Sequence, residues 1–149
     1  MGDDLNISTL NVNGLADPKK RRDVFCYLRE QKHDIYFLQE THIKENLENC
    51  IRSIWGYELW IAGNSTNRNG VAILFNSTFE YKVHNVKKDP NGCYIIIDAD
   101  IQNKRVTLVN IYGQTLGVFF CSQVTLASVK SRIYSQIISG MQAIPWTPH

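Results

Sequence analysis

Acidic residues are absent from the end of the chain. All 14 aspartates and glutamates lie at or before Asp100, so the last 49 of the 149 residues carry four basic groups and no acid. Magnesium sites need hard oxygen ligands, usually carboxylates. Any such site must therefore be built without Asp or Glu from the final third of the chain.

Cysteine motifs and long apolar runs are also missing. The four cysteines lie far apart, with no Cys-x-x-Cys pair, which indicates neither a zinc site nor a disulfide framework. The sequence does not open with a charged segment followed by an apolar core, and no run approaches the ~18 apolar residues of a membrane span. We therefore expect an intracellular protein, in the nucleus or cytoplasm, that is not secreted and not inserted in a membrane.

The overall charge is too small to indicate a nucleic-acid partner, because the net value is only +2. One basic run nevertheless stands at the start of a predicted helix, where the helix dipole disfavours each positive group by about 0.3–1 kcal/mol. Two readings remain open for it, a phosphate-binding edge or nuclear localisation signal on one side and a solvated helix face on the other. The candidate nucleic-acid-binding residues are Lys19, Lys20, Arg21 and Arg22, with the pair Lys87 and Lys88 as a second basic site.

Two short strands are predicted to end in polar side chains. The run Ile35–Leu38 is apolar at every position, which is typical of a strand inside a sheet, and it ends in Gln39-Glu40-Thr41-His42. The strand Asn6–Val12 carries Asn11 near its end and is followed by Asn13-Gly14. Ligands of α/β sheets gather at carboxyl ends of strands. Glu40 is therefore a candidate metal ligand, and the alternative is that it only solvates a strand end.

The remaining pattern predicts helices and antiparallel strands. A helix capped by Asp17 with a proline at its first position should run to about Lys32 and bury Val24, Phe25 and Leu28. A second helix is expected over Glu45–Trp55, with Leu47, Ile51 and Ile54 as its apolar stripe. Further strands are expected at Tyr57–Ala62, Val71–Phe75, Phe79–His84, Cys93–Ile101 and Arg105–Tyr112, and an amphipathic helix at Leu126–Met141.

Four motifs occur in order along the chain: LNVNGL at 10–15, YFLQETH at 36–42, GVAILF at 70–75 and LVNIYG at 108–113. Together they resemble the endonuclease/exonuclease/phosphatase superfamily with its DNase I-like fold, and most of all the endonuclease domains of LINE-type retrotransposons. The resemblance divides the chain into residues 1–113, an N-terminal portion of that domain, and residues 114–149, a divergent tail. It implies an α/β (α+β) fold, a partial four-layer α/β/β/α sandwich of which the first sheet and its helices are present and the C-terminal half is missing.

The resemblance also implies a chemistry. In this family the Asn of LNxNGL and the Glu of QET lie beside a magnesium ion, which assigns Asn11 and Glu40 as metal ligands here. The Tyr of the NIY motif, Tyr112, would donate a hydrogen bond to the scissile phosphate. The implied activity is Mg²⁺-dependent cleavage of a DNA phosphodiester, with Asn11 and Tyr112 as catalytic residues.

The chain departs from the family pattern after Tyr112. Thr115 stands where the family has an Asn, and neither the GDFN motif nor the closing SDH motif occurs, while His149 has no Asp before it. Loss of a general base or of a transition-state donor typically costs factors of about 10²–10⁴ each. We therefore expect a truncated, catalytically incomplete endonuclease domain, or alternatively a non-catalytic fragment with weak, non-specific nucleic-acid binding or no selected function.

A truncated sandwich should leave an apolar sheet face without a partner. Ile95 and Ile97, or Ile96 on the opposite side, would form that face, and one helix about 10 Å wide cannot cover strands spaced about 4.8 Å apart. The sequence therefore predicts marginal stability, dye binding and self-association through an incomplete core.

Overall fold

Two β-sheets and two α-helices make up the part of the chain that the computed structural model describes, residues 5–63, 69–76 and 79–112. The first sheet has the order β1-β2-β4-β3, and the second has the order β5-β6-β7. Among the described strands, β1 and β2 pair in parallel and the other pairs are antiparallel. The strands are β1 (Ile7–Asn11), β2 (Ile35–Gln39), β3 (Leu59–Ala62), β4 (Val71–Phe75), β5 (Tyr81–Lys88), β6 (Tyr94–Ile101) and β7 (Lys104–Ile111).

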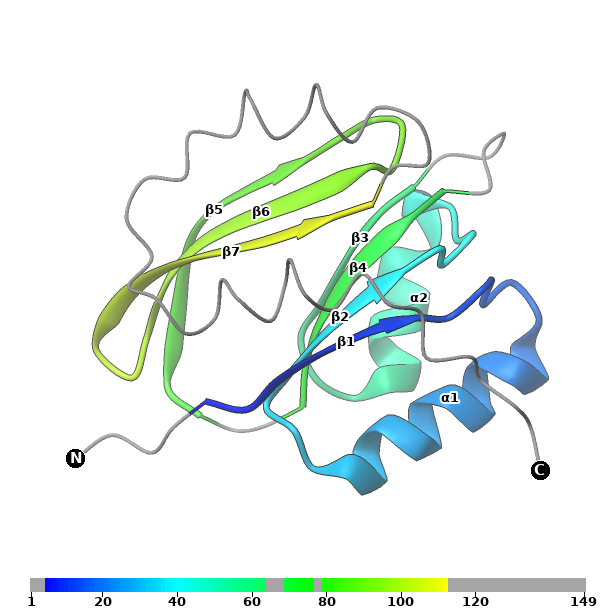
Figure 1. Cartoon of the computed structure of the whole chain (residues 1–149), viewed down its shortest axis with the longest axis horizontal. Coiled ribbons are helices and arrows are strands. Elements are labelled where there is room, and N and C mark those ends of the chain that lie inside the picture. The colour runs from blue at the N-terminus through cyan, green and yellow to red at the C-terminus, as the bar shows by residue number, and fades with distance from the viewer. Residues whose placement is uncertain (1–4, 64–68, 77–78, 113–149) are drawn as a thin grey trace.

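The helices and the second sheet cover opposite faces of the first sheet (Figure 1). One core lies between the first sheet and the helices α1 (Pro18–Gln31) and α2 (Glu48–Trp55), and Trp55 is buried in it. A second core lies between the two sheets and includes Trp60. The described residues thus form three layers, α/β/β, of the predicted four-layer sandwich. No helix among them has the length and apolar character needed to cross a membrane.

Helix α1 forms as the sequence predicts. The Asp17 carboxylate accepts a hydrogen bond from the Lys20 backbone N–H at 2.8 Å, and Pro18 occupies the first helical position, where a missing N–H costs nothing. The helix ends where Lys32 adopts a left-handed conformation with φ 55°. Its buried face consists of Val24, Phe25 and Leu28, which confirms the predicted stripe.

The second helix differs from its prediction. The segment starts with a 3-10 turn, η1 (Glu45–Leu47), and the α-helix begins only at Glu48. Ile51 and Trp55, four residues apart, face the sheet, whereas Leu47 and Ile54 are 44% and 45% exposed. The predicted stripe was therefore wrong at two of its three positions, because Leu47 lies in the 3-10 turn before the α-helix and the buried side of the α-helix runs through Ile51 and Trp55.

The strands follow the predicted pattern with changed ends. Strand β3 begins at Leu59 rather than Tyr57, and β5 continues to Lys88 rather than ending at His84. A two-residue turn at Gln102 and Asn103 joins β6 to β7, and both residues have positive φ, 51° and 63°.

The second sheet overturns the expectation of an uncovered apolar face. Ile95 and Ile97 are 0% exposed and belong to the core between the sheets, while Ile96, on the opposite face of β6, is half-buried. The expectation was wrong because β5, β6 and β7 do not extend the first sheet but form a separate antiparallel sheet that packs against it. The predicted boundary after residue 113, the tail and its helix Leu126–Met141 lie outside the described residues.

Candidate active site

The candidate site lies where β1, β2 and β7 end on the same side of the molecule (Figure 1). Along β2, Ile35 and Phe37 face the core between the sheets, so Gln39 continues on that inner face. Asn11 at the end of β1 pairs in register with Gln39. The two strand ends that the sequence singled out are therefore direct neighbours.

Glu40 marks the point at which the chain turns away from the sheet. Its φ is +52°, in the left-handed region that costs a non-glycine residue on the order of 1–3 kcal/mol. Neighbouring loops hold this turn: the Gly14 N–H donates to the Glu40 carbonyl at 2.6 Å, and the Thr41 N–H donates to the Gly70 carbonyl at 3.1 Å. The backbone at Glu40, whose side chain is half-buried, is thus held by hydrogen bonds to two other loops.

Tyr112 reaches Glu40 from the other sheet. Its hydroxyl donates a hydrogen bond to Oε1 of Glu40, although 72 residues separate them in sequence. The Tyr112 backbone N–H donates to the Cys93 carbonyl at 2.7 Å, which continues the pairing of β7 with β6. The structure therefore brings together two of the predicted site residues from different sheets.

Asn11 completes the group from the adjacent strand. Its side-chain Oδ1 accepts a hydrogen bond from the Asn13 backbone N–H at 3.0 Å, a local turn that orients the amide. An amide oxygen has two lone pairs, and this bond uses one of them. Asn11 can therefore keep this turn and still offer an oxygen to a cation.

A buried polar network stands directly behind the site, and the sequence analysis missed it. Asn110 is only 1% exposed, and its Nδ2 donates to the carbonyls of Leu38 and Ala72 at 2.9 and 2.8 Å. Gln39 donates to Asn110 Oδ1 at 2.9 Å and to Thr9 Oγ1 at 2.8 Å. The available signal was an amide that follows Val106 and Leu108 at the next inward-facing position of the strand, since buried amides need partners.

Two glycines allow the loops at this end to approach closely. A Cβ at Gly70, whose φ is +123°, would lie 2.5 Å from Oγ1 of Thr41, and a Cβ at Gly14 would lie 2.7 Å from Nδ1 of His42. Thr41 Oγ1 and His42 Nε2 are buried and have no hydrogen-bond partner within the described part of the chain. Side chains at either glycine would push against the segment that carries Glu40.

The side chains at the strand ends suit a hard cation that takes few of its ligands from the protein. No group of three or more His, Cys, Asp or Glu side chains occurs within the described ranges, so Glu40 supplies a single carboxylate beside the Asn11 amide. Mg²⁺ usually keeps several waters and binds one or two carboxylates together with substrate phosphates. The residues present match that mode and do not match an all-protein cage.

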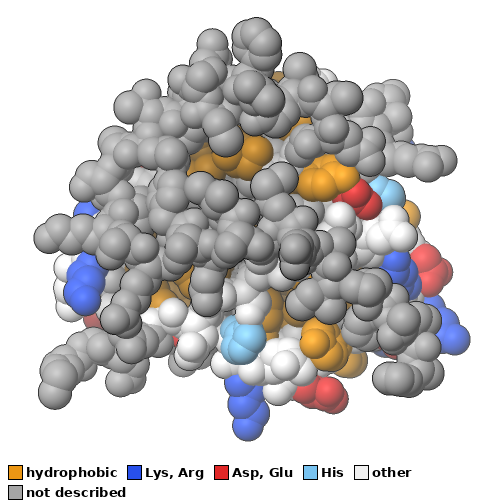
Figure 2. Space-filling view, viewed as in Figure 1, with side chains coloured by type: hydrophobic (Ala, Val, Ile, Leu, Met, Phe, Trp, Pro, Cys, Tyr) orange, Lys and Arg blue, Asp and Glu red, His pale blue; other side chains and the backbone are white. Residues whose placement is uncertain are grey.

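The basic run divides into two pairs. Lys20 Nζ donates to the Asn13 carbonyl at 2.8 Å and Arg21 donates to the Leu15 carbonyl at 3.0 Å, so both hold the segment after β1. Lys19 and Arg22 are exposed. On the face shown in Figure 2, visible basic side chains are scattered around the edge with acidic ones among them. Only the exposed pair remains suited to an external phosphate.

Of the second basic site, Lys88 is engaged within the protein. Its Nζ lies 2.5 Å from Glu48 Oε2 and 3.3 Å from Glu45 Oε1, so the end of β5 is tied to the start of α2. Lys87 is exposed.

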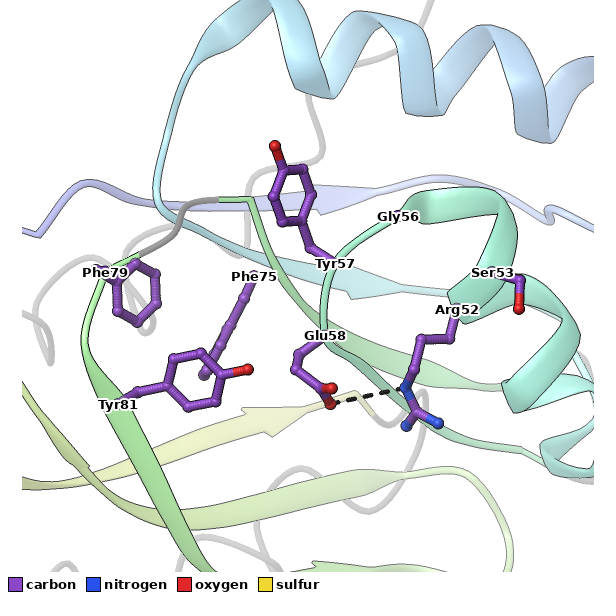
Figure 3. A pocket seen from close by; sticks show the side chains of 8 residues that line it. All are labelled: Arg52, Ser53, Gly56, Tyr57, Glu58, Phe75, Phe79 and Tyr81. Carbon is purple, nitrogen blue, oxygen red and sulfur yellow. Dashed lines mark ion pairs between the residues drawn. The ribbon is translucent and has the colours of Figure 1, made fainter.

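A separate hollow lies at the opposite end of β3 and β4 (Figure 3). The ion pair between Arg52 Nε and Glu58 Oε2, at 3.7 Å, borders it, together with the rings of Tyr57, Phe79 and Tyr81. None of the predicted site residues lines it. It is therefore distinct from the site at the strand ends.

Comparison with solved structures supports the fold. An AP endonuclease from Leishmania major superposes with a TM-score of 0.56 at 18% identity, covering 79% of this chain and 43% of that one. A 3' phosphatase from Neisseria, solved bound to product DNA hairpin, superposes with a TM-score of 0.53 at 26% identity, covering 73% of this chain and 41% of that one. The chain thus spans less than half the length of either structure.

Sequence comparison places the chain in a family. An uncharacterized 149 kDa protein of transposon TX1 from Xenopus laevis is 29% identical over 113 residues, which is 76% of this chain and 9% of that protein. The "Endonuclease/Exonuclease/phosphatase family" matches residues 8–138, a range that extends beyond the motif-based resemblance. The chain therefore belongs to the endonuclease/exonuclease/phosphatase family, as the four motifs predicted.

Proposed function

We propose that the chain is the N-terminal portion of a Mg²⁺-dependent DNA endonuclease domain of a LINE-type retroelement, acting in the nucleus or cytoplasm. The observation that carries the proposal is the contact between the Tyr112 hydroxyl and the Glu40 carboxylate across the two sheets, next to Asn11. The Neisseria enzyme bound to DNA and the relative from a transposon support a DNA substrate and a retroelement origin.

Each residue would have a defined role. Glu40 and Asn11 would hold Mg²⁺, which when bound supplies positive charge that offsets the charge of a phosphate. The Tyr112 hydroxyl, which donates its one hydrogen to the Glu40 carboxylate in the free chain, would turn to donate it to a phosphate oxygen placed beside that carboxylate. These contacts bind and orient a phosphodiester.

Turnover requires groups that the 149 residues do not supply. The GDFN and SDH motifs, which would provide a base for the attacking water and further phosphate ligands, are absent from the sequence. Several losses of about 10²–10⁴ each would bring the rate to background. We therefore propose that this chain by itself binds metal and nucleic acid without cleaving DNA.

A plasmid-nicking assay tests the missing turnover. We expect the purified chain to nick supercoiled DNA in the presence of Mg²⁺ no faster than Glu40→Ala does. Glu30→Ala, which removes an exposed carboxylate from α1, is the charge-matched control. Nicking by the unaltered chain and by Glu30→Ala that disappears in Glu40→Ala would refute the incomplete-enzyme proposal and establish an active endonuclease.

Metal binding is tested separately with Mn²⁺ as a paramagnetic probe. We expect Mn²⁺ to broaden the backbone amide NMR signals of Asn11 and Glu40 in the unaltered chain and in Glu30→Gln. In Glu40→Gln, the signals at the same two positions should not be broadened. Equal broadening in Glu30→Gln and Glu40→Gln would show that the cation does not bind at the strand ends.

Weak, non-specific nucleic-acid binding is a second candidate function, favoured by the exposed Lys19 and Arg22. We expect dissociation constants of about 10⁻⁴–10⁻⁶ M that rise with salt. Changing both residues to Ser should reduce the slope of log K against log salt by about 1.8 if each contacts a phosphate. The double change of the exposed Lys32 and Lys44 removes the same charge elsewhere and should leave the slope nearly unchanged.

A further inference from the structure

We propose that Gln39 and Asn110 are positioning residues that set the register between the two sheets and thereby place Tyr112 against Glu40. The catalytic meaning of this placement rests on the proposed function, but the placement itself is a property of the metal-free chain. The site is assembled from two separate sheets, with Glu40 at the end of the first and Tyr112 at the end of the second.

Asn110 joins three strands at one point. It belongs to β7 in the second sheet, and the two hydrogens of its amide reach the carbonyls of Leu38 on β2 and Ala72 on β4, at 2.9 and 2.8 Å. Leu38 and Ala72 are register partners in the first sheet. One side chain of the second sheet therefore contacts a matched pair of backbone groups on the first.

Gln39 extends the contact to the remaining strand of the site. Its Nε2 donates to Asn110 Oδ1 at 2.9 Å and to Thr9 Oγ1 at 2.8 Å. Thr9 lies on β1 and pairs in register with Phe37. The network thus connects β1, β2, β4 and β7.

The network members are close in sequence to every residue of the site. Asn110 precedes Tyr112 by two residues, Leu38 precedes Glu40 by two, and Thr9 precedes Asn11 by two. Gln39 is adjacent to Glu40. A shift of one sheet relative to the other would therefore move the phenol away from the carboxylate by nearly the same amount.

Apolar packing alone does not fix this register. Burial of apolar surface is non-directional, so the side chains between the sheets favour contact without selecting one offset. Hydrogen bonds weaken steeply when distance or angle departs from the preferred range, and buried groups that lose their partners are costly. The four bonds of Gln39 and Asn110 described above select the offset that places Tyr112 at Glu40.

A purely structural role would look different in experiment. Leu108 lies two residues before Asn110 on the same inward face of β7 and is 1% exposed. Leu108→Ala therefore weakens the packing between the sheets and leaves the polar network in place. A residue that only contributes stability would act like Leu108.

The test observes Tyr112 directly in the full chain without metal or DNA. The protein is labelled with ¹³Cζ-tyrosine, and the Tyr112 signal is assigned by its absence in Tyr112→Phe. Glu40→Ala gives the position of this signal when the hydroxyl has lost its carboxylate acceptor. We expect Asn110→Leu, which keeps the branched heavy-atom skeleton of Asn and removes its polar atoms, to move the Tyr112 signal most of the way to that position. Leu108→Ala should leave the Tyr112 signal unchanged, even if it lowers the melting temperature as much as Asn110→Leu does.

A second variant, Gln39→Met, tests the same inference if Asn110→Leu does not fold. Gln39→Met keeps the length of the side chain and removes the bonds that Nε2 donates to Asn110 and Thr9, and it should move the Tyr112 signal in the same direction. An unchanged signal in folded Asn110→Leu or Gln39→Met, or an equal shift in Leu108→Ala, would overturn the inference. Failure of the nicking or Mn²⁺ experiments would instead concern the proposed function, because neither enters this measurement.

Discussion

The packing of the two sheets against each other can be tested at Ile97. Its side chain is 0% exposed in the core between the sheets. Ile97→Ala removes three carbons, and at about 0.8 kcal/mol for each buried carbon the transfer loss alone is about 2.4 kcal/mol. The cavity left behind adds to this, so a loss of about 2–5 kcal/mol in the free energy of unfolding is expected.

Urea denaturation followed by circular dichroism measures this loss. With a slope of about 2 kcal/mol/M, a loss of 2.4 kcal/mol lowers the midpoint by about 1.2 M. Ile96→Ala is the matched control, because the same atoms are removed from the neighbouring, half-buried position on the other face of β6. Equal losses at Ile96 and Ile97, or a loss below about 1 kcal/mol at Ile97, would refute the inference that the second sheet covers the first.

Three further predictions concern reactivity, pH and association. Burial, and to a smaller extent the nearby Asp89 carboxylate, raises the pKa of the Cys93 thiol. Iodoacetamide at pH 8 should therefore modify Cys93 more slowly than the exposed Cys26, and equal rates measured by mass spectrometry would contradict this. The hydrogen bond from Arg105 lowers the pKa of Asp98, so this pair stabilises the fold at pH values above 3.8, the ordinary pKa of an aspartate, and the stabilisation is lost as the pH falls through the lowered pKa. Arg105→Gln should raise the Asp98 midpoint in a carboxyl NMR titration, and an unmoved midpoint would count against the pair. Self-association remains a prediction of the sequence, and a single monomeric species in sedimentation velocity would disprove it.

Local signals in the sequence were sufficient for most elements of the first sheet and for α1. Asp17-Pro18 determines where α1 starts, and the uninterrupted apolar run of β2 is buried as expected. These predictions succeed because capping and strand burial depend on a few adjacent residues. The helical segment that begins at Glu45 was harder to predict, since no local sequence signal indicates that its first turn is 3-10 rather than α.

Predictions that depend on distant residues were less complete. The second sheet could not be separated from the first by pattern, because an inward-facing strand shows the same alternation whichever sheet contains it. The motif resemblance identified Glu40 and Tyr112 individually, but their contact spans 72 residues. Gln39 and Asn110 were missed as a pair for the same reason, because their partners are backbone carbonyls and a threonine on other strands.

The position of two tryptophans on opposite faces of the first sheet makes them independent fluorescence reporters. Trp55 is 1% exposed among the helices and donates its indole N–H to the Phe75 carbonyl at 2.7 Å, whereas Trp60 is 8% exposed and contacts the ring of Phe75 between the sheets. With Trp146 replaced by Phe, emission from a Trp60→Phe variant would follow separation of the helices, and emission from Trp55→Phe would follow separation of the sheets. Comparing the two unfolding curves would therefore reveal which layer of the sandwich opens first.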